Sequence, residues 1–241
     1  MTQARLLVVV AGAAIAFIAF IALGAWQLER RAWKHALIAR VEQRVHAAPA
    51  AAPGPADWEQ VSTARDEYRR VRLTGTFVHD GEALVQASTE LGAGWWVLTP
   101  LRKADGTVVL VNRGFVPPPQ RDHRLRAKGN PLGEVEIVGL LRISEPGGGF
   151  LRRNDPLAER WFSRDVKAIS AVRRLDKVAP YFIDAERAPT TDPQAPVAGL
   201  TVLDFRDNHL AYAITWFALA TMVVAAAVAL MQFERRRVTP G

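Results

Sequence analysis

Two long stretches of the chain are apolar and carry no charged side chain. The first covers residues 6–28, where Gln27 is the only strongly polar residue, and the second covers residues 210–231. A bilayer core about 30 Å thick is crossed by roughly 20 such residues in an α-helix. The pattern therefore predicts transmembrane helices over residues 6–28 and 209–231, joined by a segment long enough to fold as one domain.

An alternative for the first stretch is a cleaved signal peptide, because Ala22 and Gly24 precede Ala25 in a small-x-small pattern. The positive region before the stretch consists only of Arg5 and the amino terminus. The apolar run also exceeds the usual length of about 7–15 residues. A retained membrane anchor is therefore the preferred interpretation.

Basic residues at the ends of the stretches predict the orientation. Arg235–Arg237 follows the second stretch directly, and only Arg206 stands just before it. By the positive-inside rule the carboxyl terminus is then cytoplasmic. The first stretch indicates the opposite, since the basic residues of 30–34 follow it and only Arg5 precedes it. Long loops translocate largely regardless of charge, so the second stretch is given more weight.

This reasoning predicts a multi-pass protein of the cell inner membrane with both termini in the cytoplasm. The two apolar helices form a hairpin, and a periplasmic domain is inserted between them. The predicted layout is a cytoplasmic tail (1–5), the first span (6–28), a helix extension with an alanine-proline linker (29–57), the periplasmic β-rich domain (58–208), the second span (209–231) and a basic cytoplasmic tail (232–241).

The inserted segment is predicted to be mostly β-structure. Asp105-Gly106 between two apolar, β-branched runs is a strong hairpin signal for residues 95–115. Residues 46–57, "HAAPAAAPGPAD", are expected to be an extended spacer. Several short strands with one or two helices favour a barrel-like α+β domain. The further expected elements are strands at 68–79, 82–88, 134–143 and 179–184, a helix at 164–175, and loops at 117–131 and 188–199.

Composition excludes several kinds of site. The chain has no cysteine, which excludes disulfides, thiolate-bound zinc, a c-type haem attachment site and a thiol redox centre. Because the chain has only three methionines, a Cu(I) site built from thioether ligands is not expected. The net charge of +7 is spread among 24 acidic residues, so contact with membrane lipid is expected and no nucleic acid partner is predicted.

No catalytic motif stands out, and we predict that the protein is not an enzyme. The sequence has no GxSxG, P-loop or dinucleotide fingerprint, and no two histidines stand at HxxxH or HExxH spacing. A membrane-anchored periplasmic enzyme with a dispersed active site is the weaker alternative. Four of the five histidines are expected to have no role in chemistry. His79 is expected in a turn, and solvated surface positions are expected for His35, His46 and His123.

His209 differs because it stands where polar sequence gives way to the second span. His209, Tyr212 and Trp216 share one helical face, at i, i+3 and i+7. If the hairpin closes, Arg30 and the tryptophans beside it would lie near the same interface. An aromatic belt with a capping histidine is the simpler interpretation. The same residues also suit a haem, whose iron an imidazole ligates and whose propionates pair with arginine.

Five stretches, in order, resemble the surfeit-locus-one family of cytochrome c oxidase assembly proteins. "NHLAYAITWFALA" (208–220) resembles the family's second-span signature, and "LGAWQLERRAWK" (23–34) resembles its first-span exit. The others are "GWWVLTPL" with "VLVNRGFVP" (94–117), "GLLRISEP" (139–146), and Asn154 with Trp161–Asp165. Two departures are Phe115, where tryptophan is more usual, and the lack of a proline near Asn208-His209.

The resemblance implies an assembly factor for a haem–copper terminal oxidase that binds haem a and helps its insertion into the catalytic subunit. It implies His209 as an axial ligand of the haem iron, and Tyr212, Trp216 and Arg30 are expected in the same haem site. The expected partners are the oxidase catalytic subunit and haem a synthase. A scaffold for oxidase subunits that binds no haem is the alternative, and no catalytic residues are implied.

Overall fold

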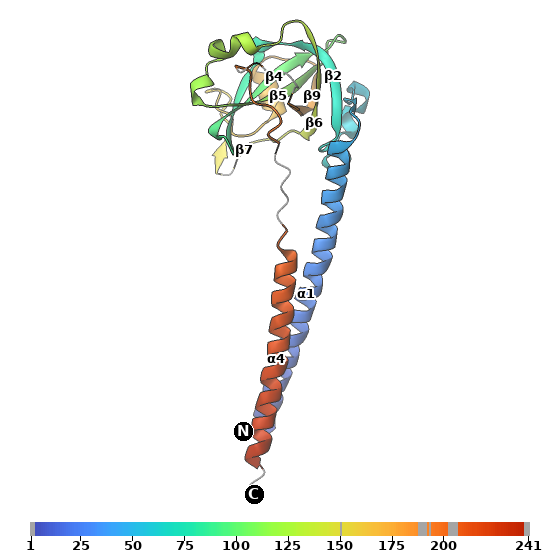
Figure 1. The fold of residues 1–241 in the computed structure, drawn as a ribbon, viewed down its shortest axis with the longest axis vertical. Coiled ribbons are helices and arrows are strands. Elements are labelled where there is room, and N and C mark those ends of the chain that lie inside the picture. Colours follow the sequence, from blue (N-terminus) through green and yellow to red (C-terminus); the bar gives the residue numbers. More distant parts are fainter. Residues whose placement is uncertain (1–2, 150, 188–191, 193, 202–206, 239–241) are drawn as a thin grey trace. The chain divides into compact units, whose positions relative to one another are not determined.

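A computed structural model describes residues 3–149, 151–187, 192, 194–201 and 207–238 (Figure 1). The chain divides into two compact units. One unit contains Met1–Arg40 and Asp204–Gly241, and the other contains Val41–Leu203.

A β-barrel forms the centre of the unit between the two long helices. The strands β2 (Arg70–Phe77), β6 (Glu134–Ile143), β9 (Val178–Ala185), β5 (Val108–Val116) and β4 (Gly92–Arg102) are neighbours in this order. The ring closes where β2 pairs with β4, at Thr76–Arg102 and Phe77–Leu101. β5 and β9 are parallel, and the other pairs in the ring are antiparallel. The prediction of a mostly-β, barrel-like domain between two apolar helices is confirmed.

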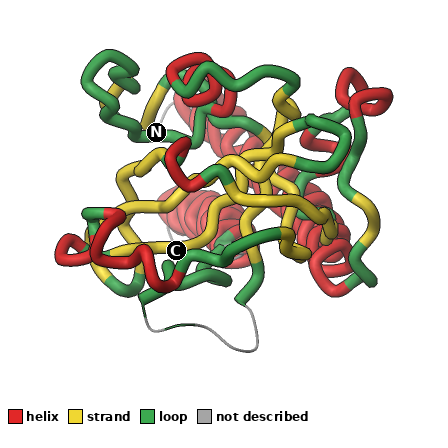
Figure 2. The backbone as a smooth tube through the Cα atoms, turned by 90° about the horizontal axis from the view of Figure 1, so that it is seen from above, coloured by secondary structure: helices red, strands yellow, loops and turns green. Residues whose placement is uncertain are grey.

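Smaller elements lie around the barrel (Figure 2). β3 (Ala83–Thr89) adds to the outer side of β4, and the short β1 (Ala50–Ala51) pairs with β2. The remaining elements are strands β7 (Gly148–Gly149) and β8 (Arg152–Arg153), helices α2 (Thr63–Asp66) and α3 (Val166–Val172), and 3-10 helices at Pro55–Gln60, His79–Gly81, Pro118–Gln120 and His123–Gly129.

Alternation along the strands sends every second side chain into the barrel. In β2, Val71, Leu73 and Phe77 are buried, whereas Arg72 and Thr74 between them are exposed. This is the two-residue period of a strand with one buried face. A second apolar cluster lies on the outside of the barrel under α3. Its buried members are Ala83, Val85, Leu98, Leu110, Trp161, Val166, Ile169 and Phe182.

The linker expected over residues 46–57 is more ordered than its composition indicates. The helix α1 ends at His46, β1 follows, and Pro55–Gln60 forms a 3-10 helix where an extended spacer was expected. The Tyr181 hydroxyl donates to the Pro53 carbonyl at 2.7 Å, and Ala52 and Trp58 pack against the barrel core. The expectation that this segment holds no helix was wrong at its end, where the 3-10 helix begins at Pro55, because tertiary contacts order a segment that has no strong preference of its own.

The other unit is a helical hairpin of α1 (Gln3–His46) and α4 (His209–Val238), which lie side by side (Figure 1). Both are long and apolar enough to cross a membrane. Their contact is close because Gly24 has no side chain, and a Cβ there would lie 2.5 Å from the Phe217 ring. Ala213 and Ala220 are buried in the same contact, as small residues usually are between membrane helices.

Candidate functional site

The amino-terminal end of α4 is held by Asp207. Its carboxylate accepts a hydrogen bond from the backbone N–H of His209 at 3.0 Å. The first turns of a helix leave backbone N–H groups without partners, and an aspartate is among the best side chains to satisfy one of them. His209 is therefore fixed at a helix start, with its backbone position set by its near neighbour.

His209 contacts the first helix through its ring. Its Nδ1 lies 2.7 Å from the Oε1 of Gln27, and the ring is half-buried. This contact occupies Nδ1 and leaves Nε2 as the ring nitrogen that is not engaged with the first helix. No hydrogen bond to Nε2 occurs among the residues that the structure describes. The ring is thus oriented by one nitrogen and able to bind a metal through the other, as metal-ligating histidines usually are.

Asp207 also joins the two helices. It accepts a hydrogen bond from His35 Nε2 at 2.8 Å and lies 3.6 Å from the Nε of Arg31. The N–H of His209 lowers the pKa of Asp207, partial burial opposes this, and His35 lowers the pKa further. His35 was expected to be a solvated surface residue, and it is half exposed but bonded to Asp207.

The remaining predicted haem-site residues lie elsewhere on the hairpin. Arg30 stacks on Trp33, with its guanidinium carbon 4.4 Å from the ring centroid. It is Arg31, one residue later, that faces α4. Tyr212 is 57% exposed, and Trp216 stacks on Phe20 at a centroid distance of 5.7 Å. The structure therefore brings Gln27 to His209, and it records no contact of Arg30, Tyr212 or Trp216 with that ring. Their place in a haem site stays a prediction.

Gln27, Arg31 and Asp207 were not singled out as site residues from the sequence. A signal for Gln27 was present, because it is the only strongly polar residue of the first apolar stretch. Polar groups within membrane helices are costly unless they find a partner in the protein. A search for the partner of that one residue would have led to His209.

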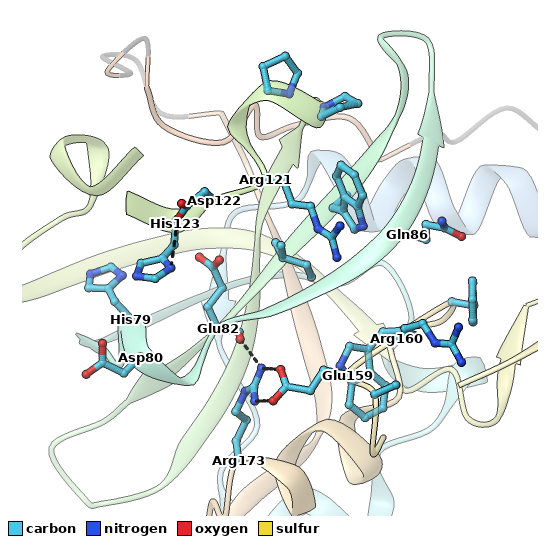
Figure 3. A pocket seen from close by; sticks show the side chains of 17 residues that line it. His79, Asp80, Glu82, Gln86, Arg121, Asp122, His123, Glu159, Arg160 and Arg173 are labelled. Atoms are coloured by element: carbon cyan, nitrogen blue, oxygen red, sulfur yellow. Dashed lines mark hydrogen bonds and ion pairs between the residues drawn. The ribbon is translucent and has the colours of Figure 1, made fainter. Parts of the chain in front are cut away.

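The β-domain has a cavity of about 980 Å³ on its outer surface (Figure 3). Its lining combines titratable side chains with Trp95, Trp161 and Phe162. His79, Asp80, Asp122 and His123 lie toward one end, and Arg121 and Gln86 toward the other. The Arg173–Glu159 ion pair lies between them at 2.7 Å. His79, as expected, belongs to a turn, and its Nε2 contacts the Pro131 carbonyl at 3.0 Å.

The described residues contain no cluster of three or more side chains suited to hold a metal ion. A haem iron can be held by one imidazole, so this absence does not bear on the prediction for His209.

Buried carboxylates in the domain predict an acid-labile fold. Burial opposes the ionisation of Asp66, but bonds from the Ser62 N–H, Arg65 and Arg69 outweigh it and lower the pKa below the ordinary 3.8. Burial likewise opposes ionisation of Glu145, and Arg164 lowers its pKa below 4.5. A carboxyl group whose pKa is lower in the folded than in the unfolded state stabilises the fold at pH values above its unfolded-state pKa. This stabilisation is lost as the pH falls through the folded-state pKa.

We therefore expect the urea midpoint of the domain to be level near neutral pH and to fall steeply below about pH 4.5. Circular dichroism of the full-length protein in detergent measures this transition. An Asp66→Asn variant should be less stable at pH 7 and lose less stability on acidification. A midpoint of the unmodified protein that does not change between pH 6 and pH 3 would contradict this assignment.

The fold defines a class of protein, in which two candidate membrane helices flank a β-barrel domain. In this chain the two helices are joined by the contacts of His209 with Gln27 and of Asp207 with His35. A sequence model of the SURF1 family matches residues 14–221, so the chain belongs to the SURF1 family. It is 36% identical to human Surfeit locus protein 1 in an alignment 239 residues long, which covers 91% of this chain and 75% of the human protein.

Two further relatives agree. Mouse Surfeit locus protein 1 is 38% identical over 215 residues, covering 82% of this chain and 67% of the mouse protein. The SURF1-like protein of Monosiga brevicollis is 38% identical over 216 residues, covering 84% of this chain and 80% of that protein. Membership of the family implies a role in cytochrome c oxidase assembly, which fits a protein that is not an enzyme.

Two of the stretches that resemble the family have structural roles in the β-domain. The Asn154 side chain accepts from the N–H groups of Phe162 and Ser163, at 2.8 and 3.2 Å, and so fastens the loop that walls the cavity. Position 139 has no room for a side chain, because a Cβ on Gly139 would collide with the carbonyl oxygen of Asp184 on β9. Asn154 therefore supports the wall of the cavity, and Gly139 permits the close pairing of β6 with β9.

Proposed function

We propose that this protein is an assembly factor of a haem–copper oxidase that binds haem a through His209 and helps its transfer to the catalytic subunit. The observation that carries the proposal is the contact of His209 Nδ1 with Gln27 Oε1, which leaves Nε2 as a metal-binding atom. The position also fits, because haem a is largely apolar and His209 stands at the first residue of an apolar helix.

The proposed arrangement places the protein in the cell inner membrane with both termini cytoplasmic and the β-domain periplasmic. The partners are then the catalytic subunit that receives haem a and the synthase that supplies it. Imidazole ligation gives the cargo a specific iron contact, and the surrounding helices limit its exposure to water. In this proposal Arg30, Tyr212 and Trp216 are the further residues that would contact the macrocycle.

A scaffold that holds an oxidase subunit without binding haem is the second candidate. The cavity on the domain favours it, because an open surface with aromatic and arginine side chains has the composition of protein interfaces. The two candidates differ in one observable, which is the presence of haem on the purified protein.

The test is an optical spectrum of the full-length protein purified in mild detergent after co-expression with the enzymes of haem a synthesis. The haem-carrier proposal predicts a haem a spectrum and a haem-to-protein ratio near one. A colourless protein that still supports assembly of the oxidase would overturn the haem proposal and leave the scaffold. Co-expression without the haem a enzymes serves as the control for adventitious haem b.

A further inference from the structure

The cavity described above is one part of a longer groove along β3. A second cavity of about 410 Å³ shares Gln86, Trp95, Pro118 and Phe162 with it. The floor is the outward side of β3 and β4, where Gln86 and Trp95 are opposite one another in the ladder. One wall is the loop after β5, and the other is the segment around Phe162. The two cavities are therefore adjacent on the surface of the domain and together form the groove.

The outer edge of β3 is open along part of this groove. β3 is the last strand of its sheet, and within the described part of the chain its other edge makes a single bridge, between Val85 and Trp161. There the Gln86 N–H donates to the Trp161 carbonyl at 2.8 Å. Ser88, two residues later, lines the groove with its side chain exposed and has no further strand beside it in the described chain. An open edge of this kind accepts an extended polypeptide by strand addition.

Two arginines at the groove are held in place by aromatic rings. Arg121 lies 4.8 Å from the Trp95 ring centroid, and Arg152 lies 5.5 Å from that of Phe162. Arg152 also donates to the side-chain amide oxygen Oε1 of Gln86 at 2.8 Å. Neither guanidinium has a carboxylate partner among the residues that the structure describes. The remaining N–H groups are thus positioned for an acidic group from outside.

Two nearby arginines differ from Arg121 and Arg152 because each has a carboxylate partner. Arg160 is paired with Asp155 at 2.7 Å, and Arg173 is paired with Glu159 at 2.7 Å. These two are neutralised within the domain. The positive charge available to a ligand therefore lies with Arg121 and Arg152, around the point where the two cavities meet.

We propose that this groove binds an extended, acidic segment of a partner polypeptide. The segment adds to the open edge of β3, an acidic side chain reaches Arg121 or Arg152, and an apolar side chain packs against Trp95 and Phe162. Main-chain pairing supplies a generic affinity, and the arginines with their aromatic supports supply selectivity. A small molecule is disfavoured, because such ligands are held in sites that bury most of their surface, whereas this groove runs open along the domain.

Site-specific photocrosslinking in native membranes tests the proposal. A benzophenone amino acid replaces Ala93, which lines the groove and is exposed, and in a control protein it replaces Thr74, which is exposed on β2. Irradiation of membranes that contain the assembling oxidase should give a discrete protein adduct at position 93 and none at position 74. Peptide mass spectrometry should place the adduct in an extended segment with at least one aspartate or glutamate.

A double variant, Arg121→Gln with Arg152→Gln, should reduce the adduct by about tenfold or more, the effect of losing one charge-assisted hydrogen bond. The matched control is Arg124→Gln with Arg153→Gln, which removes two exposed arginines and the same charge. Circular dichroism must show the same fold for both. Absence of the adduct, an adduct only with lipid or haem, or equal adducts in both double variants would each overturn the proposal. Haem on the protein is unaffected in either case, so this test is independent of the His209 proposal.

Discussion

Replacing Asp184 by alanine is expected to destabilise the β-domain by about 3–5 kcal/mol, the usual cost of removing one partner of a buried ion pair. Asp184 is 4% exposed on β9. It accepts from Arg142 at 2.9 Å and from Arg164 at 3.2 Å, and it also accepts from Asn112 at 2.8 Å. The variant removes the counter-charge that the two largely buried guanidinium groups share and frees the Asn112 amide, while Glu67 stays beside Arg142 and Glu145 beside Arg164.

Chemical denaturation of the full-length protein in detergent, followed by the far-ultraviolet signal of the β-domain, measures this loss. The matched control is Glu186→Ala, two residues further along, whose carboxylate pairs with Arg70 at 2.7 Å near the surface. Exposed pairs contribute little because water screens them, so the control should unfold close to the unmodified protein. Equal losses in the two variants would show that the buried network around Asp184 has no special weight.

Much of the barrel could be predicted from the sequence because its strands obey a simple period. The expected strand at 134–143 coincides with β6, and the expected hairpin contains β4 and β5 joined at Asp105-Gly106. Closure of the ring could not be predicted. It depends on the pairing of Phe77 with Leu101 and on the parallel pairing of β5 with β9, which no local pattern specifies. The expected loop at 188–199 lies partly outside the described residues.

The helical hairpin shows where a sequence argument about a site loses precision. One residue turns an α-helix by about 100°, so Arg30 and Arg31 point to different sides although both follow the first apolar stretch. The sequence predicted Arg30 as the cation near His209. In the structure it is Arg31 that lies close to this end of α4, with its Nε 3.6 Å from the Asp207 carboxylate. The His35–Asp207 bond joins residues far apart in the chain, and only the register of the two helices brings them together.

Replacing His209 by alanine is expected to abolish the haem a spectrum of the purified protein. The ring would supply the iron ligand through Nε2, and no other imidazole of the described residues contacts Gln27. The measurement is the haem-to-protein ratio and the optical spectrum of full-length protein co-expressed with the haem a enzymes. His35→Ala is the matched control, because it removes an imidazole from the same end of the hairpin that contacts Asp207 and not Gln27. A haem spectrum that is the same in His209→Ala and unmodified protein would end the ligand assignment.

Gln27→Leu extends the same test to the orientation of the ring. Loss of a group that orients a metal-binding histidine typically costs about 10- to 100-fold in metal affinity, so haem should be retained weakly and with an altered spectrum. Gln27→Glu keeps an acceptor for Nδ1–H and should restore binding, with an imidazole of greater donor strength and hence a lower reduction potential. A purely structural role of the Gln27–His209 bond would instead change the stability of the hairpin and leave that potential unmoved. The potential therefore separates a residue that orients the iron ligand from one that only joins two helices.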